Sequence, residues 1–361
     1  MKTMLSMLCM ASLGTAAFLA APSAHAQTSA CNFNAHAAAV AGVGPTGNIV
    51  VLAHRGVWGL VKGAHNDPEN SRGAIETARD SCLDGMELDV KLTKDQVPVL
   101  MHDTNLGRTT NVYARNSPAA QKYDPYKNTG DNPTVSFLTA AQVTALQLLD
   151  NRNRDLTGYH VPTVETALDY WSISPKGTVV FDVKDVLTMQ KVIAAARASL
   201  GTRLDPLGAG LFYKLNATIF PTYAAYLSAA GANAHITPIP VYTPNMLVKI
   251  NVPASYADWA KHVHHIEIDM KTTNGLLSDI YNSAERNPGI KVGVFNAIPD
   301  ADRSTGEFFK SNGQCCYKLN DLLVVSSTLR DSTDQRGSFG YVTDNFDIIT
   351  TDDPFGLLDT L

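Results

Sequence analysis

Short apolar segments alternate with longer amphipathic segments along most of the chain. Eight apolar segments are candidate strands: Ile49–Ala53, Gly85–Val90, Thr178–Val183, Ala209–Leu215, His235–Val241, His265–Met270, Ile290–Phe295 and Phe346–Thr350. Segments with helical periodicity lie between them, among them Ser71–Asp84, Val186–Leu200, Pro221–Ala230, Ser255–His262 and Gly275–Arg286. Such alternation predicts parallel strands joined by crossover helices. Eight units fit a closed (β/α)₈ TIM-type barrel, although an open doubly wound sheet has the same local pattern.

One stretch, residues 111–133, breaks this alternation. It contains Pro118, Pro125, Gly130 and Pro133, together with three tyrosines. Proline and glycine at this density predict a long loop inserted after the second strand and not a domain of its own. The loop is either a lid that contacts substrate or a solvated insertion. We therefore expect one domain over residues 27–361.

The N-terminus has the pattern of a secretory signal peptide. Lys2 precedes an apolar stretch, Met4–Ala21, and a small-residue cleavage site follows at Ala24-His25-Ala26. This order predicts that residues 1–26 are removed and that the mature chain is secreted or periplasmic, with a retained N-terminal anchor as the alternative. No later apolar run has comparable length, so we expect no stable membrane insertion.

Composition and charge limit the classes of partner that the mature chain can bind. Loss of Lys2 changes the formal net charge from −5 to −6, which offers no basic surface for nucleic acid. A hydrophobic content of 45% is typical of a well-packed globular protein, and we expect a small molecule as its partner. Oligomeric state does not follow from these features.

Four of the five cysteines lie in the expected mature chain, at Cys31, Cys82, Cys315 and Cys316. An oxidising compartment permits disulfides among them, but spacing alone leaves the connectivity open. A structural bridge from Cys31 or Cys82 to the Cys315-Cys316 pair is one candidate.

Two expected strands place acidic side chains on the face that points into the barrel. In the segment 86–90, Glu87 and Asp89 alternate with three apolar residues, so the two acids share a face. Asp182 and Lys184 alternate in the same way with apolar neighbours. The apolar residues must face the helices, which directs the acids toward the C-terminal mouth of the barrel.

Three converging carboxylates require a positive partner. Two like charges about 4 Å apart repel by roughly 4 kcal/mol at an effective dielectric of 20. An all-oxygen cluster of Glu87, Asp89 and Asp182 favours one hard divalent cation, Ca²⁺ or Mg²⁺. The alternative is an ion-pair network in which Arg55 and Lys184 neutralise the acids.

Two histidines flank the acidic cluster in sequence. His54 ends the first expected strand and His102 follows the second. Cleavage of a phosphodiester needs one group that removes a proton from the attacking oxygen and one that protonates the leaving alkoxide, and imidazoles do both near neutral pH. Arg55 and Lys184 are the side chains available to bind the phosphate.

A series of motifs resembles the glycerophosphodiester phosphodiesterase family. In order they are His54-Arg55-Gly56, Pro68-Glu69-Asn70-Ser71, Glu87-x-Asp89, Pro98-Val99, His102-Asp103, Arg108-Thr109-Thr110, Leu138-Thr139, Pro162-Thr163-Val164-Glu165, Asp182-x-Lys184 and Ile348–Pro354. The resemblance implies a TIM-type barrel and hydrolysis of glycerophosphodiesters to glycerol phosphate and an alcohol.

The resemblance also implies a role for each matching residue. His54 and His102 would be the catalytic acid–base pair, and one divalent cation would bind to Glu87, Asp89 and Asp182. Arg55 and Lys184 would contact phosphate. Glu69 would either support the site from behind or lie close to the metal, and Asp103 would support it from behind.

Two departures from the family pattern bear on substrate choice. The family usually has Glu where this chain has Asp182, which is shorter by about one C–C bond, roughly 1.5 Å. Residues 57–67 form a longer connection than usual. Two other functions are therefore kept open. One is a phospholipase D-like enzyme that acts on lysolipids or sphingolipids, and the other is a protein that binds phosphodiesters without cleaving them.

A second acidic pair, Glu267 and Asp269, repeats the same alternation further along the chain. We expect it to pair with Lys214 or Lys271 and not to hold a second cation. The neighbouring histidines of the segment 262–265 fall at the start of a strand, the end of a barrel associated with stability, so we assign them no ligand role.

Overall fold

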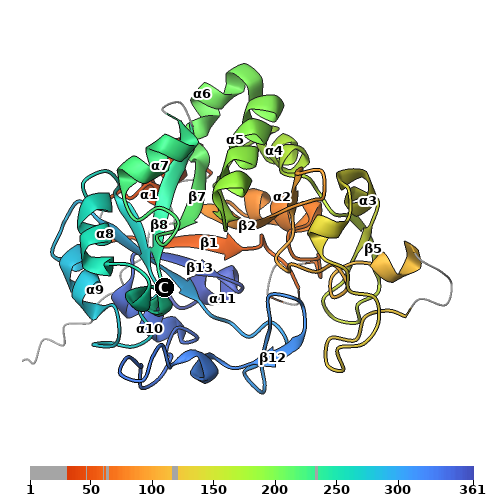
Figure 1. Cartoon of the computed structure of the whole chain (residues 1–361). Coiled ribbons are helices and arrows are strands. Elements are labelled where there is room, and N and C mark those ends of the chain that lie inside the picture. The colour runs from red at the N-terminus through yellow and green to blue at the C-terminus, as the bar shows by residue number, and fades with distance from the viewer. Residues whose placement is uncertain (1–30, 46, 60, 62–64, 116–120, 232–234) are drawn as a thin grey trace, which may run out of the picture.

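A computed structural model describes residues 31–45, 47–59, 61, 65–115, 121–231 and 235–361. The expected signal peptide, residues 1–26, lies outside these residues. Within the described chain, eight parallel strands close into a barrel, because β1 pairs with both β13 and β2 (Figure 1). In order around the barrel they are β1 (Val50–His54), β2 (Gly85–Leu92), β6 (Thr178–Val183), β7 (Leu211–Asn216), β8 (Thr237–Tyr242), β9 (His265–Ile268), β10 (Lys291–Asn296) and β13 (Ile348–Thr351).

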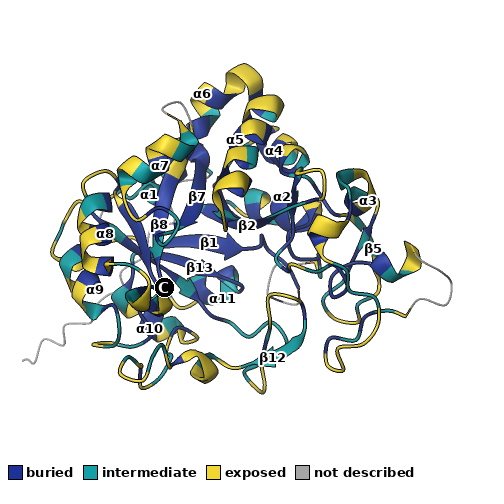
Figure 2. Cartoon of the chain, in the orientation of Figure 1, coloured by how far each residue is buried: buried dark blue, intermediate teal, exposed yellow. Residues whose placement is uncertain are grey.

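The closed barrel confirms the TIM-type prediction over the open doubly wound sheet. Each expected strand begins and ends within two residues of the observed one. The helices around the barrel are α2 (Arg72–Asp80), α4 (Val164–Ser172), α5 (Val186–Leu200), α6 (Leu204–Leu207), α7 (Tyr223–Ala230), α8 (Val252–Trp259), α9 (Ser278–Glu285), α10 (Phe339–Asn345) and α11 (Pro354–Leu358). Their outer surfaces are exposed, whereas the strands that they cover are buried (Figure 2).

Successive side chains of each barrel strand point alternately outward and inward, so they form two buried layers. Met86, Leu88 and Val90 of β2 join the large apolar core between strands and helices. The opposite face of the barrel strands points inward, where Leu52 and Phe212 belong to a smaller apolar cluster. The inward positions nearer the strands' C-terminal ends carry polar side chains instead, so the pleat itself concentrates polar groups at the mouth.

Helix α2 begins as the sequence predicts and ends earlier. Ser71 is its N-cap, and Oγ of Ser71 accepts a hydrogen bond from the backbone N–H of Ala74 at 3.1 Å. The expected continuation to Asp84 is wrong, because Cys82 adopts a positive φ of 57° that a helix cannot contain. Cys82 instead forms a disulfide with Cys31.

The N-terminal helix α1 (Phe33–Val40) closes the end of the barrel opposite the mouth. Val40 is fully buried in the inner apolar cluster with Leu52 and Phe212. The ring Nδ1 of His265 lies 2.9 Å from the backbone oxygen of Val40. Together with the Cys31–Cys82 disulfide, these contacts fix α1 as a plug.

A second packing unit lies beside the mouth, between β2 and α4. Its elements are β3 (Pro98–Leu100), α3 (Ala140–Thr144), β4 (Gln147–Leu149) and β5 (Leu156–His160), and it has an apolar cluster of its own. The described part of the expected 111–133 insertion belongs here. It is packed and not fully solvated, because Tyr123 is 2% exposed and its backbone oxygen accepts a hydrogen bond from Arg154.

Another long connection runs from β10 to α10 and carries a two-stranded hairpin, β11 (Phe308–Phe309) with β12 (Cys315–Tyr317) (Figure 1). The sequence did not predict these two strands, which are short and are formed by long-range pairing across a loop. No helix of the described residues is long and apolar enough to cross a membrane.

Candidate active site

The C-terminal ends of β1 and β2 bring one histidine and two acids together. His54 and Glu87 are register partners on these adjacent strands, and Asp89 follows Glu87 on the same inward face. Nε2 of His54 lies 3.7 Å from Oε2 of Glu87. One potential ligand atom from each of His54, Glu87 and Asp89 lies within 4.8 Å of the others, and all three residues are buried. The sequence therefore placed these three residues in one group.

Asp182 lies next to this group on the neighbouring strand but has another partner. Asp89 and Asp182 are register partners of β2 and β6, so their side chains leave the barrel wall side by side. The carboxylate of Asp182 accepts a hydrogen bond from Nζ of Lys184 and forms an ion pair with it. Asp182 is not among the group of close ligand atoms formed by His54, Glu87 and Asp89.

Burial and mutual repulsion oppose ionisation in the acidic group of Glu87 and Asp89. Burial raises the pKa of Glu87 well above its usual value, and the negative charges of Asp89 and Asp182 raise it further. Burial also opposes ionisation of Asp89, but His102 and Arg55 outweigh it and lower the pKa of Asp89. A hard divalent ion beside these oxygens would relieve the repulsion, so the donor set fits Ca²⁺ or Mg²⁺.

A carboxylate from the end of the chain holds His54. Nδ1 of His54 lies 2.7 Å from Oδ1 of Asp352, and the indole Nε1 of Trp58 donates to the same oxygen at 3.0 Å. The ring of His54 also packs on Phe295, with centroids 4.6 Å apart. Nε2 of His54 is thereby directed toward Glu87. Sequence analysis missed Asp352 as a site residue, although it lies in the last-strand motif.

His102 has the same kind of support. Its Nδ1 lies 2.8 Å from Oδ1 of Asp103, whose side chain is fully buried. Arg108 donates to Asp103 from Nε at 2.6 Å and to both oxygens of Glu69 at 2.6 and 3.0 Å. Through Arg108, these contacts join Asp103, which holds His102, to Glu69, which also accepts from Arg55. The linking role of Arg108 was not predicted.

Arg55 is surrounded by carboxylates. It adopts a positive φ of 60° and its side chain is 4% exposed. One terminal nitrogen donates to Glu69 at 3.3 Å and to Asp300 at 3.1 Å. Its Nε lies 3.6 Å from Asp89 and is a buried nitrogen with no hydrogen-bond partner. The guanidinium is thus held at the acidic group with one donor still available.

Asn70 fixes the backbone and side chain of Asp89 together. Its amide nitrogen donates to Oδ2 of Asp89 at 3.1 Å, and its oxygen accepts from the backbone N–H of Asp89 at 3.0 Å. This reciprocal pair explains the asparagine of the Pro68–Ser71 motif, for which sequence analysis gave no role.

The second acidic pair, Glu267 and Asp269, forms internal ion pairs. Nζ of Lys214 lies 2.6 Å from Oε2 of Glu267 and donates to Thr350 at 2.9 Å. Asp269 pairs with Arg336 at 3.2 Å. The prediction of an internal partner is confirmed for Glu267, whereas the partner of Asp269 is neither predicted lysine.

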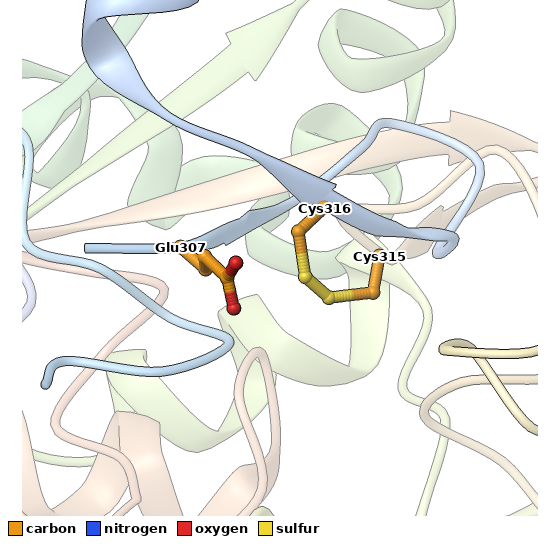
Figure 3. A group of neighbouring side chains, drawn as sticks. All are labelled: Glu307, Cys315 and Cys316. Carbon is orange, nitrogen blue, oxygen red and sulfur yellow. A yellow bond between two sulfur atoms is a disulfide. The ribbon is translucent and has the colours of Figure 1, made fainter. Parts of the chain in front are cut away.

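The cysteine pair of the hairpin does not reach the N-terminal cysteines. Cys315 is bonded to Cys316, and Cys31 to Cys82, so the predicted bridge between the two regions is wrong. The carboxylate of Glu307 lies beside the Cys315–Cys316 disulfide on the same side of the hairpin (Figure 3). These three residues resemble a metal group by proximity alone, because disulfide sulfurs are not thiolate ligands.

The fold and these side chains define a TIM barrel with a group of histidines and buried acids at its mouth. The pattern of the Glycerophosphoryl diester phosphodiesterase family matches residues 54–249, more than half of the chain. The chain belongs to this family.

Similarity to curated relatives is confined to a short segment. Glycerophosphodiester phosphodiesterase 1 of Homo sapiens is 43% identical over 71 residues, which are 20% of this chain and 20% of that protein. The glycerophosphodiester phosphodiesterase of Bacillus altitudinis is 48% identical over 62 residues, 17% of this chain and 23% of that protein. The match thus spans about a fifth of the length of these relatives.

Solved structures share the fold over nearly the whole chain. A glycerophosphoryl diester phosphodiesterase from Parabacteroides distasonis has a TM-score of 0.54 at 18% identity, with 91% of this chain and 92% of that one covered. An Oleispira antarctica phosphodiesterase in complex with the product sn-glycerol-3-phosphate has a TM-score of 0.52 at 18% identity, with 86% and 95% covered.

Proposed function

We propose that this chain hydrolyses glycerophosphodiesters to glycerol phosphate and an alcohol, by acid–base catalysis from His54 and His102. The observation that carries the proposal is the group at the mouth of the barrel, in which His54, held by Asp352, lies with the buried acids Glu87 and Asp89. His102, held by Asp103, lies close enough to Asp89 to lower the pKa of that carboxyl. Family membership and the product named for the Oleispira antarctica structure support the choice of substrate.

Each histidine would move one proton. With Nδ1 held by Asp352 or Asp103, the Nε2 of either ring is the atom free to act. One imidazole takes a proton from the attacking oxygen, and the other gives a proton to the leaving alkoxide, which is otherwise a poor leaving group. The carboxylate partners stabilise each imidazolium while it exists.

Glu87 and Asp89 would hold one divalent cation, Ca²⁺ or Mg²⁺, with Asp182 as the third ligand if it exchanges Lys184 for the metal. The bound cation would neutralise charge on the phosphate oxygens. Arg55 and Lys184 would bind the phosphate itself. Asn70 keeps the Asp89 carboxylate in place by its two hydrogen bonds.

Secretion of the chain is part of the proposal. The two disulfides, Cys31–Cys82 and Cys315–Cys316, are typical of an oxidising compartment such as the periplasm or the exterior of the cell. They therefore support the expectation drawn from residues 1–26. N-terminal sequencing of the exported protein tests it, and a mature chain that still begins at Met1 would contradict it.

A substrate panel with metal replacement tests the activity. We expect glycerophosphocholine and related glycerophosphodiesters to be hydrolysed, with activity lost in chelator and restored by Ca²⁺ or Mg²⁺. His54→Ala and His102→Ala should each abolish hydrolysis while the fold, followed by circular dichroism, is retained. Faster cleavage of lysophosphatidylcholine than of glycerophosphocholine would favour the phospholipase D-like alternative. Binding of glycerophosphodiesters without turnover would favour a binding protein.

A further inference from the structure

The connection from β10 to α10 contacts the site through Asp300. Its Oδ2 accepts a hydrogen bond from Arg55 at 3.1 Å, and its Oδ1 accepts one from the backbone N–H of Phe309 at 2.9 Å. The Asp300 side chain is 5% exposed, so water has little access to these bonds. Asp300 thus joins a site arginine to the hairpin β11–β12, which lies beyond the region matched by the family.

The hairpin is itself fixed on both sides. The ring of Phe309 lies over the guanidinium of Arg108, 4.8 Å from its centre, in a cation–π contact. Phe309 pairs with Cys315 on β12, and the backbone N–H of Cys315 donates to the backbone oxygen of Pro125 at 2.9 Å. The described part of the insertion after β2 therefore holds the hairpin, and the hairpin holds Asp300.

We propose that Asp300 is a positioning residue that aims the guanidinium of Arg55 at the substrate phosphate, so that the hairpin sets substrate affinity. This inference rests on the proposed function. Arg55 has three neighbours in Glu69, Asp89 and Asp300 that compete for its donors. Asp300 and Glu69 share one terminal nitrogen of Arg55, and this double contact leaves Nε, the unpartnered nitrogen, beside Asp89 at the acidic group where phosphate would bind.

The contact needs a carboxylate and not only a polar side chain. Two donors, from Arg55 and from the Phe309 backbone, each use one oxygen of Asp300. An asparagine offers one oxygen and one NH₂ group, so it can accept from only one of the two donors and opposes the other. Asp300→Asn therefore separates Arg55 from the hairpin with almost no change of volume.

A purely electrostatic role of Asp300 predicts a change in KM opposite to that predicted by a positioning role. Removal of a negative charge close to an anion site strengthens anion binding, so Asp300→Asn would lower KM if Asp300 acted only through its field. Loss of positioning raises KM instead. We expect KM for glycerophosphocholine to rise about tenfold, the effect of one charge-assisted hydrogen bond. kcat should change less than about threefold, because Arg55 would bind phosphate in the ground state and in the transition state alike.

The test compares Asp300→Asn with Asp302→Asn, a more exposed acid on the same connection whose carboxylate accepts from Ser304. The control should keep the KM of the wild type. Phe309→Leu retains the backbone N–H and removes the ring from Arg108, and it serves as a second variant with a smaller expected rise in KM. Unchanged or lowered KM in Asp300→Asn, with the wild type active, would overturn the inference.

Phosphate binding separates this inference from the proposed function. Titration calorimetry with inorganic phosphate, in the presence of Ca²⁺ or Mg²⁺, measures the anion site without turnover. We expect the Kd of phosphate to rise about tenfold in Asp300→Asn. Absence of hydrolysis by the wild type would refute the proposed function, whereas equal phosphate affinity in wild type and Asp300→Asn would refute the role of Asp300.

Discussion

The carboxylate of Asp352 lies 2.7 Å from Nδ1 of His54, although 298 residues separate the two in the chain. Burial would raise the pKa of Asp352, but its contact with His54, the positive charge of Arg55 and the hydrogen bond from Trp58 outweigh it and lower that pKa. An ionised carboxylate at this position selects the imidazole tautomer with hydrogen on Nδ1, which leaves the lone pair of Nε2 at the site.

Asp352→Asn tests this relationship. An amide holds Nδ1 less strongly and can select the other tautomer, so we expect kcat to fall by at least about tenfold while KM changes little. Steady-state hydrolysis of glycerophosphocholine measures the change. Trp58→Phe is the matched control, because it removes an indole N–H that donates to Asp352 and to the backbone oxygen of His54 but keeps the contact between Asp352 and Nδ1 of His54, so it should retain most of the activity. Wild-type kcat in Asp352→Asn would show that the carboxylate does not act through His54.

Asp182→Glu should strengthen cation binding. The shorter Asp182 is paired with Lys184 in the structure, whereas a side chain longer by roughly 1.5 Å would extend toward the Glu87 and Asp89 oxygens. We expect the Kd for Ca²⁺ or Mg²⁺ to fall several-fold by titration calorimetry. Asp279→Glu, an exposed acid on α9, should leave the Kd unchanged. A weaker cation affinity in Asp182→Glu would mean that Asp182 already has the better length.

The buried pair of Lys214 and Glu267 should be sensitive to removal of one partner. Lys214→Met leaves the Glu267 carboxylate buried without its ion-pair partner, which costs about 3–5 kcal/mol of the free energy of unfolding. The double variant Lys214→Met with Glu267→Leu should recover most of that loss, because no unpaired charge remains. Urea denaturation of the wild type and the two variants measures both effects. Equal losses in Lys214→Met and in the double variant would contradict this account.

His265 should make the folded protein sensitive to acid. Burial and the nearby charge of Lys214 lower the pKa of His265 from 6.5 to about 3. Between these two values the unfolded chain binds a proton that the folded chain does not, so stability falls as the pH decreases from about 6.5 toward 3. The contribution of one such group is about 3–5 kcal/mol over the whole window.

Replacement of the imidazole isolates this contribution. Asparagine at position 265 can still donate to the Val40 backbone oxygen that Nδ1 of His265 contacts. Urea denaturation of His265→Asn at pH 7, 5 and 4 should show a weaker decline of the free energy of unfolding than the wild type. The same decline in both proteins would assign the acid sensitivity to other groups.

Local sequence pattern predicted the parts of the fold that depend on alternation. Glu87 and Asp89 face inward and Leu88 faces the helices because the side-chain period of a strand is two, which needs no knowledge of distant residues. The strand ends follow from the same pattern. The number of strand–helix units fits a closed sheet but also an open one, and the pairing of β1 with both β2 and β13 decides between them.

Contacts between distant segments could not be predicted in this way. The pairing of Asp352 with His54, and of Asp300 with Arg55, depends on which loops meet at the barrel mouth. The acids of the last-strand motif were the one available signal for Asp352. Asp182 pairs with Lys184. Whether it does so depends on the lengths of the two side chains, and a sequence motif does not reveal that outcome.

The disulfides illustrate the same limit. Cys82 reaches Cys31 because α2 ends early and α1 lies under the barrel, and neither fact is visible in the spacing of the cysteines. Cys315 and Cys316 bond to each other in the hairpin. Connectivity is thus a product of the fold and not a guide to it.

Helix α1 seals the floor of the barrel, where Val40 and the inward apolar side chains fill the interior. Because this end of the barrel is filled, a ligand can reach the site only from the mouth. On the proposed function, substrate would therefore enter and glycerol phosphate would leave at the same face of the barrel. Accumulated product should for this reason compete with substrate for entry.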